Sequence, residues 1–581
     1  MCGIVGYIGK NNPKDILLNC LKKLEYRGYD SSGIALKNKN DLQIIKSVGK
    51  IKNLEEKINN TKIINSNIGL AHTRWATHGK VNEENAHPHT YGKITIVHNG
   101  IIENASILKG ELIDEGYSFN SDTDTEVIAC LLNKYYNGDI IFAINKVIKL
   151  LKGSYALGIV IEGVDKLYAV KKDSPLVIGI GKDDYYLASD VLALNNYTNQ
   201  YILLDDYEVV GIDNKLTITK DNKEIKKEII KLDIEVTNDD KNGYDHYMLK
   251  EIMEEPDLIR NLLSEIKDMP DIKKYNEIHI VGCGSAYYAG TIAKNLIEEY
   301  SNIKVICEIA SEYRYKKVIY DKNTLVILIS QSGETADTIA ALRKAKENDA
   351  DTLAIVNVKT STIARESDKQ IFIEAGSEIA VATTKAFMLQ VLVLSLLSLY
   401  NSEYKDDESI MEEIHQLPLY IEELLNKRDD YLNIAKKIYK ENNIIFIGRK
   451  IDYSLCLEGS LKLKEVSYIH SEAYQAGELK HGTISLINDG FYVFGIVTDD
   501  SIRDKTIANI EEVKTRGAIP IYISNEDNNN YDNKIIVKKT NPFIQSMLII
   551  PVLQLIAYEV AKLRNCDIDK PKNLAKSVTV E

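Results

Sequence analysis

The sequence predicts an α+β domain with antiparallel sheets, followed by two α/β domains that are each built on a parallel sheet. The chain has 581 residues, enough for about three or four domains. Residues 1–235 hold short apolar or alternating runs between Gly and Asn turns, which is typical of antiparallel strands. From Asn276 onward, strand-like runs alternate with helical patterns, which predicts βαβ units.

The first domain is expected to combine short strands with two helices. The expected strands are Cys2–Ile8, Ile68–Ala71, Ile94–Val97, Ser154–Ile161, Leu167–Val170 and Tyr201–Val210. The expected helices are Pro13–Leu24 and Thr123–Tyr136. Helices packed outside antiparallel sheets fit this order. A polar break at Thr237–Tyr244 then ends the domain, because domain boundaries favour polar segments.

The second part of the chain reads as two copies of one α/β unit. In the first copy, strand-like and helical segments alternate at 277–282, 286–300, 305–309, 323–330, 336–348 and 352–358. In the second copy, Ile444–Gly448 repeats the pattern of Ile278–Gly282, and Ser471–Glu472 repeats Ser311–Glu312 at a similar offset. A diverged tandem duplication explains this similarity.

These patterns divide the chain into three domains with connecting segments. Helical stretches at Tyr247–Leu263 and Tyr404–Asn426 lie between the sheet-forming parts. We expect domains at 1–236, 272–428 and 429–565, a linker with a connecting helix at 237–271, and a C-terminal tail at 566–581.

Composition argues against several classes of protein. The net charge of −13 argues against binding to a nucleic-acid backbone. Seven scattered Cys without a CxxC motif are typical of reduced cytosolic thiols. No secretory signal is expected at the N-terminus. Phe387–Tyr400 is too short to span a bilayer, and Phe543–Leu563 is interrupted by polar residues. We therefore expect a soluble, cytoplasmic protein.

The second residue is a candidate nucleophile. If the initiator methionine is trimmed, Cys2 carries both a thiol and a free α-amine. That amine has an ordinary pKa of about 7.7–8.0, near the value of about 8.5 for a thiol, so it can act as the thiol's own base. The alternative is a cysteine that merely follows the start codon.

Histidines, an arginine and an aspartate gather farther along the first domain. Five of the ten His fall between residues 72 and 98, which raises a metal site as one hypothesis. No HExxH motif occurs, and the His-Pro-His spacing is poor for zinc, so hydrogen bonding between loops is the favoured interpretation. Arg74 and Asp124 can bind the carboxylate and ammonium of an α-amino acid. Asn99 and Gly100 can donate to an oxyanion.

These segments resemble the glutaminase domain of class II (N-terminal nucleophile) amidotransferases. The resemblance rests on MCGIVGYIG, EYRGYDSSG, HTRWATHG, NAHPH, HNGIIEN and DTDTEVIA. It implies a four-layer αββα fold and ammonia passed internally to a second site. By position, it makes Cys2 the nucleophile with its own amine as base. It places Arg74 and Asp124 on the α-groups of glutamine, and Asn99 and Gly100 in the oxyanion hole.

A candidate phosphate site follows a strand of the first α/β copy. The segment SQSGETADT at 330–338 lies between a strand and a helix, where hydroxyls and the helix N-terminus can hold a phosphate. The alternative is an ordinary helix N-cap. The nearby VGCGSAYYAG does not match a dinucleotide loop, because GxGxxG needs Gly where Tyr287 stands.

Acid–base groups concentrate in two later segments. Lys462 and Glu465 are spaced to share one face of a helix, and His481 follows in a predicted loop. From spacing alone, a surface salt bridge is the simpler interpretation. Lys576 can serve as a Schiff-base amine if its neighbours desolvate it; otherwise it is one more exposed lysine.

Nearly the whole chain resembles the glutamine:fructose-6-phosphate amidotransferase family. The most specific motifs are AVATTKAF, EAYQAGELKHG and the C-terminal LAKSVTVE. The resemblance implies two sugar-isomerase (SIS-type) domains, a homodimer, and glutamine and fructose 6-phosphate as substrates. The products would be glutamate and glucosamine 6-phosphate, in the first step of UDP-N-acetylglucosamine synthesis. No metal or other cofactor is expected, because a proton shuttle and a covalent lysine cover the chemistry.

The same resemblance implies a role for individual residues by their position. Those that would bind the sugar or its phosphate are Ser330, Gln331, Ser332, Thr335, Val381 and Ala575. His481 would assist ring opening, and Lys576 would form a Schiff base at C2. Glu465 would move the proton between C1 and C2, with Lys462 close by. Trp75 would gate the passage of ammonia.

One position departs from the family pattern. Ala286 stands where the family has a serine that donates to the phosphate, so we expect a loss of about 0.5–1.5 kcal/mol in binding. Ser285 or backbone amides can compensate.

Two alternative functions can be weighed against the sequence. Another class II amidotransferase would need an ATP-pyrophosphatase or phosphoribosyltransferase second half, and neither signature appears. A non-enzymatic sugar-phosphate sensor would need an N-terminal helix-turn-helix domain, where Cys2 and Arg74 stand instead.

Overall fold

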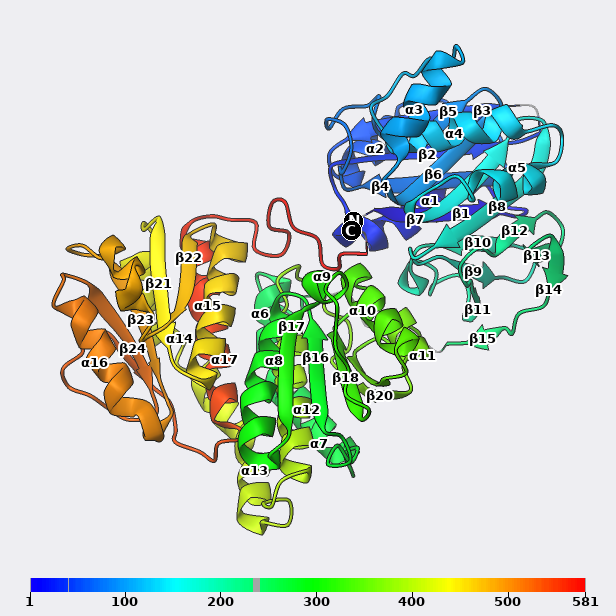
Figure 1. Ribbon diagram of the computed structural model, residues 1–581. Helices are drawn as coiled ribbons and strands as arrows, with labels where there is room; N and C mark the ends of the chain where they lie inside the picture. The colour runs from blue at the N-terminus through cyan, green and yellow to red at the C-terminus, as the bar shows by residue number, and fades with distance from the viewer. Residues whose placement is uncertain (1, 40, 233–240, 580–581) are drawn as a thin grey trace. The chain divides into compact units, whose positions relative to one another are not determined.

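The computed structural model describes residues 2–39, 41–232 and 241–579 (Figure 1). The chain divides into two compact units, Met1–Asn238 with Ser577–Glu581, and Asp239–Lys576. The predicted boundary between residues 236 and 237 lies outside the described residues, and the other predicted boundaries stay predictions.

The first unit contains an eight-stranded and a seven-stranded sheet, both built from antiparallel strand pairs. The eight-stranded order is β15-β11-β9-β10-β1-β4-β2-β3, and the seven-stranded order is β14-β13-β12-β8-β7-β6-β5. The strands of the first sheet are β1 (Gly3–Ile8), β2 (Ser31–Lys37), β3 (Leu42–Val48), β4 (Ile68–Arg74), β9 (Val177–Ile180), β10 (Tyr185–Ala188), β11 (Gln200–Leu203) and β15 (Ile230–Lys231). Those of the second sheet are β5 (His89–Tyr91), β6 (Ile94–Ile102), β7 (Gly153–Ile161), β8 (Val164–Lys172), β12 (Val209–Ile212), β13 (Leu216–Lys220) and β14 (Lys223–Ile225).

Helices cover the outer faces of the two sheets (Figure 1). Helices α1 (Pro13–Leu24) and α2 (Ile51–Asn59) pack on the eight-stranded sheet. Helices α3 (Ala105–Asp114), α4 (Asp124–Tyr135) and α5 (Ile140–Val147) pack on the seven-stranded sheet. A third apolar cluster fills the space between the sheets. The four layers confirm the predicted αββα fold.

The predicted strand Tyr201–Val210 is wrong, because this segment forms two strands in different sheets. Strand β11 pairs with β9 in one sheet, and β12 pairs with β8 in the other. Between them, Tyr207 adopts φ 68°, in the left-handed region that chains enter mainly at turns. Its N–H donates to the carbonyl oxygen of Lys171 at 2.8 Å. The turn therefore carries the chain from one sheet to the other.

The second unit contains two five-stranded parallel sheets with the same strand order. We call the sheet β17-β16-β18-β19-β20 with its helices the first module, and β22-β21-β23-β24-β25 the second module. The first sheet comprises β16 (Glu277–Gly282), β17 (Lys304–Ile309), β18 (Thr324–Ser330), β19 (Asp351–Val356) and β20 (Lys369–Phe372). The second comprises β21 (Asn443–Gly448), β22 (His470–Gln475), β23 (Tyr492–Val497), β24 (Ile519–Ser524) and β25 (Lys534–Ile536). The shared order supports the predicted duplication.

The helices of the second unit flank both sheets (Figure 1). They are α6 (Tyr247–Met253), α7 (Glu255–Glu265), α8 (Ser285–Leu296), α9 (Ala310–Tyr313), α10 (Ala336–Glu347), α11 (Thr362–Glu366), α12 (Lys385–Tyr400), α13 (Glu408–Leu425), α14 (Arg428–Ile438), α15 (Ile451–Ser467), α16 (Arg503–Lys514) and α17 (Ile550–Leu563). The single helix predicted at Tyr247–Leu263 is divided into α6 and α7. Pro256, in the first turn of α7, has no N–H with which to continue the preceding helix.

One apolar core extends through both modules and includes the long apolar helices α12 and α17. The stretch Gln545–Leu563 is long and apolar enough to cross a membrane, but 89% of its most apolar window is buried within the protein. Both helices therefore belong to the core, which agrees with the expectation that neither stretch spans a membrane.

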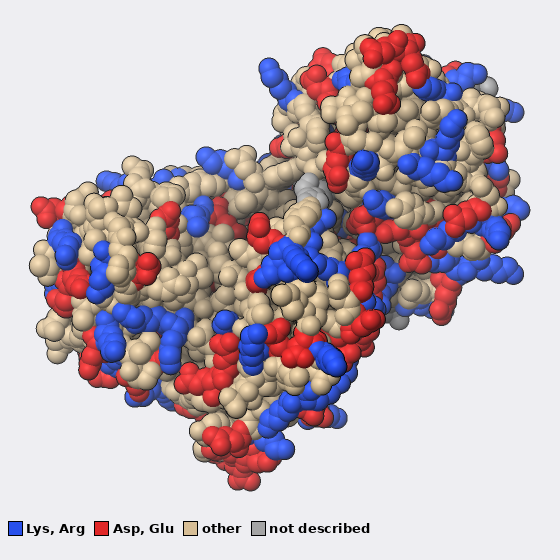
Figure 2. Space-filling model, viewed as in Figure 1, with Lys and Arg blue, Asp and Glu red and all other residues tan. Residues whose placement is uncertain are grey.

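Charged side chains of opposite sign are mixed on the visible face of the molecule. On the face shown in Figure 2, Lys and Arg side chains lie among Asp and Glu side chains. Together with the net charge of −13, this leaves that face without the broad positive surface that binds a nucleic-acid backbone.

Candidate active site

The Cys2 thiol lies at the start of β1, next to the residue that follows β4. It donates to the carbonyl oxygen of Trp75 at 3.5 Å and accepts the N–H of Trp75 at 3.3 Å. Burial raises the pKa of the Cys2 thiol, while the Trp75 N–H and the charge of Arg74 act in the opposite direction. A thiolate formed here therefore has a hydrogen-bond donor and a nearby cation to stabilise it.

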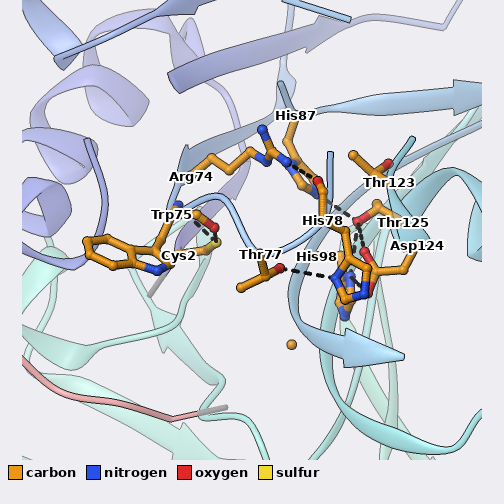
Figure 3. Close-up of a pocket in the computed structure, with 11 residues that line it drawn as sticks. Cys2, Arg74, Trp75, Thr77, His78, His87, His98, Thr123, Asp124 and Thr125 are labelled. Carbon is orange, nitrogen blue, oxygen red and sulfur yellow. Dashed lines mark hydrogen bonds and ion pairs between the residues drawn. The ribbon is translucent and has the colours of Figure 1, made fainter. Parts of the chain in front are cut away.

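Arg74 and Asp124 line the same pocket as Cys2 (Figure 3). Arg74 ends β4, is 2% exposed, and its guanidinium donates to backbone carbonyls of residues 78–80. Asp124 begins α4, and its carboxylate accepts the N–H of Ile102 at 3.0 Å. A fixed cation and a fixed anion in one pocket suit the two charged groups of an α-amino acid.

Asn99 and Gly100 lie on β6 beside the candidate nucleophile. Nδ2 of Asn99 donates to the carbonyl oxygen of Cys2 at 2.9 Å, and Oδ1 lies 3.1 Å from Nε2 of His72. Gly100 adopts φ 140°, and a Cβ there would lie 2.1 Å from the carbonyl oxygen of Ser154, so glycine is required. The side-chain amide is held against the nucleophile's backbone, close to where an oxyanion would form.

The clustered histidines form a buried hydrogen-bonded network. The Thr125 hydroxyl lies 2.8 Å from Nε2 of His87 and 3.0 Å from Nδ1 of His98. The rings of His72 and His87 stack with centroids 4.0 Å apart. Burial lowers the pKa of these three histidines and of His89, so they are neutral near pH 7. These contacts agree with the interpretation that the histidines hydrogen-bond loops together. Among the described residues, no cluster of His, Cys, Asp or Glu has the arrangement of a metal site.

We expect the first unit to lose stability as the pH falls. Burial lowers the pKa of His72 to about 3, whereas an unfolded histidine titrates near 6.5. Below about pH 6.5 the histidine therefore binds a proton in the unfolded chain but not in the folded unit. The free energy of unfolding is highest above this pH and decreases as the pH falls toward the pKa of the folded state. For His72 this should cost about 2 kcal/mol of unfolding free energy between pH 6.5 and 5, and the other buried histidines should add to the loss.

Trp75 makes this loss measurable, because it is the chain's one Trp and lies in the first unit. Urea unfolding followed by its fluorescence should show a lower midpoint at about pH 5 than at about pH 7.5. Replacing buried His89 by Asn should weaken the pH dependence, whereas replacing His415, which is exposed on α13, should leave it unchanged. Equal midpoints at both pH values would contradict the neutral cluster.

The loop between β18 and α10 gathers hydroxyl groups in front of a helix. Oγ of Ser330 accepts the N–H of Gly333 at 3.1 Å and lies 2.9 Å from Oγ1 of Thr335. Gln331 and Ser332 are partly exposed. The hydroxyls precede the N-terminus of a 12-residue helix, whose free N–H groups and dipole favour an anion.

The hydroxyl that was expected to compensate for Ala286 is already engaged. Ser285 begins α8, and its hydroxyl donates to Oε1 of Glu458 at 3.1 Å. This contact joins the two modules and argues against Ser285 as a substitute phosphate donor. Backbone amides remain for that role.

In the second module, a carboxylate occupies the position that corresponds to Ala286 in the first module. Asp452 occupies the position that corresponds to Ala286 when the terminal glycines of β16 and β21 are matched. Its carboxylate accepts the N–H of Thr498 at 2.7 Å and also the Thr498 hydroxyl. The Asp452 carboxylate therefore already occupies the donors of Thr498, which follows β23. For this reason we expect the sugar phosphate to bind in the first module.

Lys462 on α15 lies between two carboxylates. Its Nζ donates to Glu465 at 2.7 Å and lies 3.5 Å from Glu458. Its side chain is 0% exposed and that of Glu465 is 20% exposed, so the simpler interpretation as a surface salt bridge is wrong. Although burial acts in the opposite direction, the two carboxylates raise the pKa of Lys462, and burial raises that of Glu458 to about 7. Glu465 keeps partial access, which a proton-transferring base needs.

Lys576 forms an ion pair with Glu378 in which the side chains are 4% and 0% exposed. The desolvated surroundings that a Schiff-base amine requires are therefore present. Val381 is buried, and its N–H donates to the carbonyl oxygen of Asp569 at 3.0 Å. Ala575, beside Lys576, is partly exposed.

His481 lies apart from these contacts. It ends the short turn Leu479–His481 and is exposed. Within the described part of the chain, no side-chain hydrogen bond joins it to Lys462 or Lys576.

Sequence reasoning missed three buried carboxylates of the second unit and several polar residues of the Cys2 pocket. The carboxylates are Glu251, Glu378 and Glu458. Glu378 lies just before AVATTKAF and Glu458 begins EGSLKLKE, so proximity to a specific motif was the available signal. The residues missed in the pocket are Thr77, His78, Thr123 and Thr125.

Comparisons with known proteins match both units. A family model described as glutamine amidotransferase domain matches residues 72–196, and one described as SIS domain matches residues 271–400 and 437–564. Isomerizing glutamine–fructose-6-phosphate aminotransferases from Clostridium tetani and Thermus thermophilus are 46% and 40% identical to this chain, with 100% of each chain covered. The solved C-terminal domain of the glucosamine-fructose-6-phosphate aminotransferase from Francisella tularensis is 36% identical, with a TM-score of 0.54, and covers 57% of this chain and 99% of its own.

Proposed function

The chain belongs to the family of isomerizing glutamine–fructose-6-phosphate aminotransferases, and we propose that the Cys2 pocket and the Lys576 cluster divide the reaction between them. The protein transfers nitrogen from glutamine to fructose 6-phosphate and isomerises the product to glucosamine 6-phosphate, with release of glutamate. One observation supports this division. Cys2, Arg74 and Asp124 share a pocket in the first unit, whereas the buried ion pair of Lys576 and Glu378 belongs to the second unit.

Glutamine is hydrolysed at Cys2. The thiolate attacks the amide carbon after the α-amine of Cys2 takes the thiol proton. Arg74 holds the α-carboxylate and Asp124 the α-ammonium. The side-chain amide of Asn99 and the N–H of Gly100 stabilise the oxyanion. Collapse of the intermediate releases ammonia and leaves a thioester, which water converts to glutamate.

The sugar phosphate binds at the loop between β18 and α10. Residues that contact the phosphate or line the sugar are Ser330, Gln331, Ser332, Thr335, Val381 and Ala575. His481 assists ring opening. The Lys576 amine then adds to the C2 carbonyl, and loss of water gives a Schiff base. Ammonia adds at C2 and Lys576 leaves, so that the imine carries the nitrogen from glutamine.

Isomerisation follows at Glu465. Its carboxylate removes a proton from C1 and returns it to C2, which converts the ketose imine into an aldose amine. Lys462 supports this role because its ammonium holds the Glu465 carboxylate at 2.7 Å.

Three further features of the enzyme rest on the family resemblance. We propose that ammonia passes internally with Trp75 as its gate, that the enzyme is a homodimer, and that it works in the cytoplasm at the first step of UDP-N-acetylglucosamine synthesis. An internal route protects ammonia, which is largely protonated in neutral water. The contact of the Trp75 backbone with the Cys2 thiol supports a gate at this position.

Coupling between the two substrates tests the proposed division. With glutamine alone we expect slow release of glutamate, and with fructose 6-phosphate we expect faster release and equal amounts of glutamate and glucosamine 6-phosphate. Fructose without its phosphate should not stimulate, because the loop then has no anion to bind. The proposal would be contradicted if fructose 6-phosphate did not change the rate of glutamate release and no amino sugar were formed.

A further inference from the structure

The ion pair between Lys576 and Glu378 is deeply buried, and the proposed mechanism gives its carboxylate no role. A buried ion pair costs desolvation, which is offset only when geometry is good and further hydrogen bonds satisfy both partners. The groups around Glu378 therefore indicate whether its charge is a fixed feature of the site.

Glu378 is held as an anion by donors at the start of α12. One carboxylate oxygen accepts the N–H of Thr384 at 2.9 Å and of Ala386 at 3.1 Å, and the other accepts the Thr383 hydroxyl at 2.6 Å. A helix N-terminus favours a negative charge at this place. Although burial acts in the opposite direction, Lys576 and these donors lower the pKa of Glu378 to about 2.

The backbone that carries Glu378 is fixed as well. One oxygen of Glu251 accepts the N–H groups of Ile379 and Ala380, and the next residue, Val381, donates to Asp569. Burial and the nearby charge of Glu378 raise the pKa of Glu251, which disfavours a second negative charge at this place. Glu378 therefore supplies the negative charge that faces Lys576.

The charge of Glu378 also acts on the lysine that supports the proposed base. The charge of Glu378 contributes to the raised pKa of Lys462, and Lys462 holds Glu465. A single anion thus acts on both the imine-forming lysine and the lysine beside the proposed base.

We propose that Glu378 is a positioning residue for the reaction, whose carboxylate aims the Lys576 nitrogen at C2 of the sugar and serves as the counter-ion of the resulting cationic iminium. This inference rests on the proposed Schiff-base role of Lys576. The carboxylate itself forms no covalent bond and need not change its charge.

The charge balance of the covalent step explains why one fixed anion suffices. The Lys576 ammonium first gives a proton to water, and the neutral amine forms the N–C2 bond. The resulting carbinolamine takes up a proton and loses its C2 oxygen as water, which leaves an iminium. The nitrogen therefore carries one positive charge before the step and one after it, and Glu378 compensates both. When ammonia displaces the lysine, the nitrogen takes up a proton again and restores the original pair.

Borohydride trapping with fructose 6-phosphate and no glutamine tests this role. In the full-length enzyme, mass spectrometry of the Lys576 peptide measures the reduced adduct. For Glu378→Gln we expect at least a tenfold loss of adduct, because a buried cation left without its partner is strongly disfavoured. Glu378→Asp should restore part of the adduct. Glutamine hydrolysis and the Kd for fructose 6-phosphate should stay within about threefold of wild type.

Glu374→Gln provides the matched control, because Glu374 lies nearby in sequence but pairs with Lys359 at a partly exposed site. It should be trapped like wild type. If wild type is not labelled at Lys576, the Schiff-base role fails. If wild type and Glu378→Gln are labelled equally, that role stands and the role of Glu378 is overturned. Should Glu378→Gln not fold, Glu378→Asp decides. Its displaced carboxylate should lower trapping and kcat with the Kd unchanged, and unaltered trapping would overturn the proposal.

Discussion

Replacing Cys2 by Ala is expected to abolish glutamine-dependent synthesis while leaving synthesis from added ammonia. We expect glutamate release to fall by roughly 10⁴-fold or more, because the covalent route through a thioester is lost with its nucleophile. The amination site should remain active, since the buried cluster around Lys576 belongs to the other compact unit. Glutamate and glucosamine 6-phosphate measured with either nitrogen source give both rates.

A second buried thiol of the same unit serves as the control. Cys130 lies on α4 and is fully buried, so Cys130→Ala removes a sulfur without touching the pocket. This variant should still synthesise glucosamine 6-phosphate from both glutamine and added ammonia. Full glutamine-dependent synthesis by Cys2→Ala would reject Cys2 as the nucleophile.

Replacing Lys576 by Arg is expected to remove amination from either nitrogen source and to leave glutamine hydrolysis detectable. A guanidinium stays protonated at any accessible pH, so it cannot add to a ketone, yet it keeps the positive charge beside Glu378. We expect synthesis to fall by roughly 10³-fold or more. Because the ion pair with Glu378 is conserved in charge, this loss should not come with a large loss of stability.

An exposed lysine of the same tail provides the comparison. Lys572 is exposed and lies over the ring of Tyr468, so Lys572→Arg should behave like wild type. Amination that survives in Lys576→Arg would place the Schiff base on another residue. Parallel loss of glutamine hydrolysis and synthesis would instead indicate a general loss of folding.

Elements that depend on neighbouring residues were predictable from the sequence. Helix α1 covers Pro13–Leu24 as predicted, because the Asn12 side chain caps it and Pro13 favours its first turn. The repeated strand motifs predicted two similar modules, and their sheets share one strand order. Three residues of the Cys2 pocket, Cys2, Arg74 and Asp124, were predicted through motifs, since they stand within recognisable segments.

Burial of charged side chains was not predictable from spacing. Lys462 and Glu465 have the same separation in a buried cluster as in a surface salt bridge. Contacts from elsewhere in the chain distinguish the two, such as the hydroxyl of Ser285 on α8 that reaches Glu458.

By itself, the sequence determined the order of strands and helices and the chemical groups of each motif, because periodicity and local hydrogen bonding act over a few residues. Only the tertiary structure decided that the run at Tyr201–Val210 divides between two sheets, that Ser285 is engaged, and that Glu378 faces Lys576. These outcomes depend on desolvation and pairing between residues that lie up to 198 positions apart, and no local pattern records which distant group will remove water from a charge.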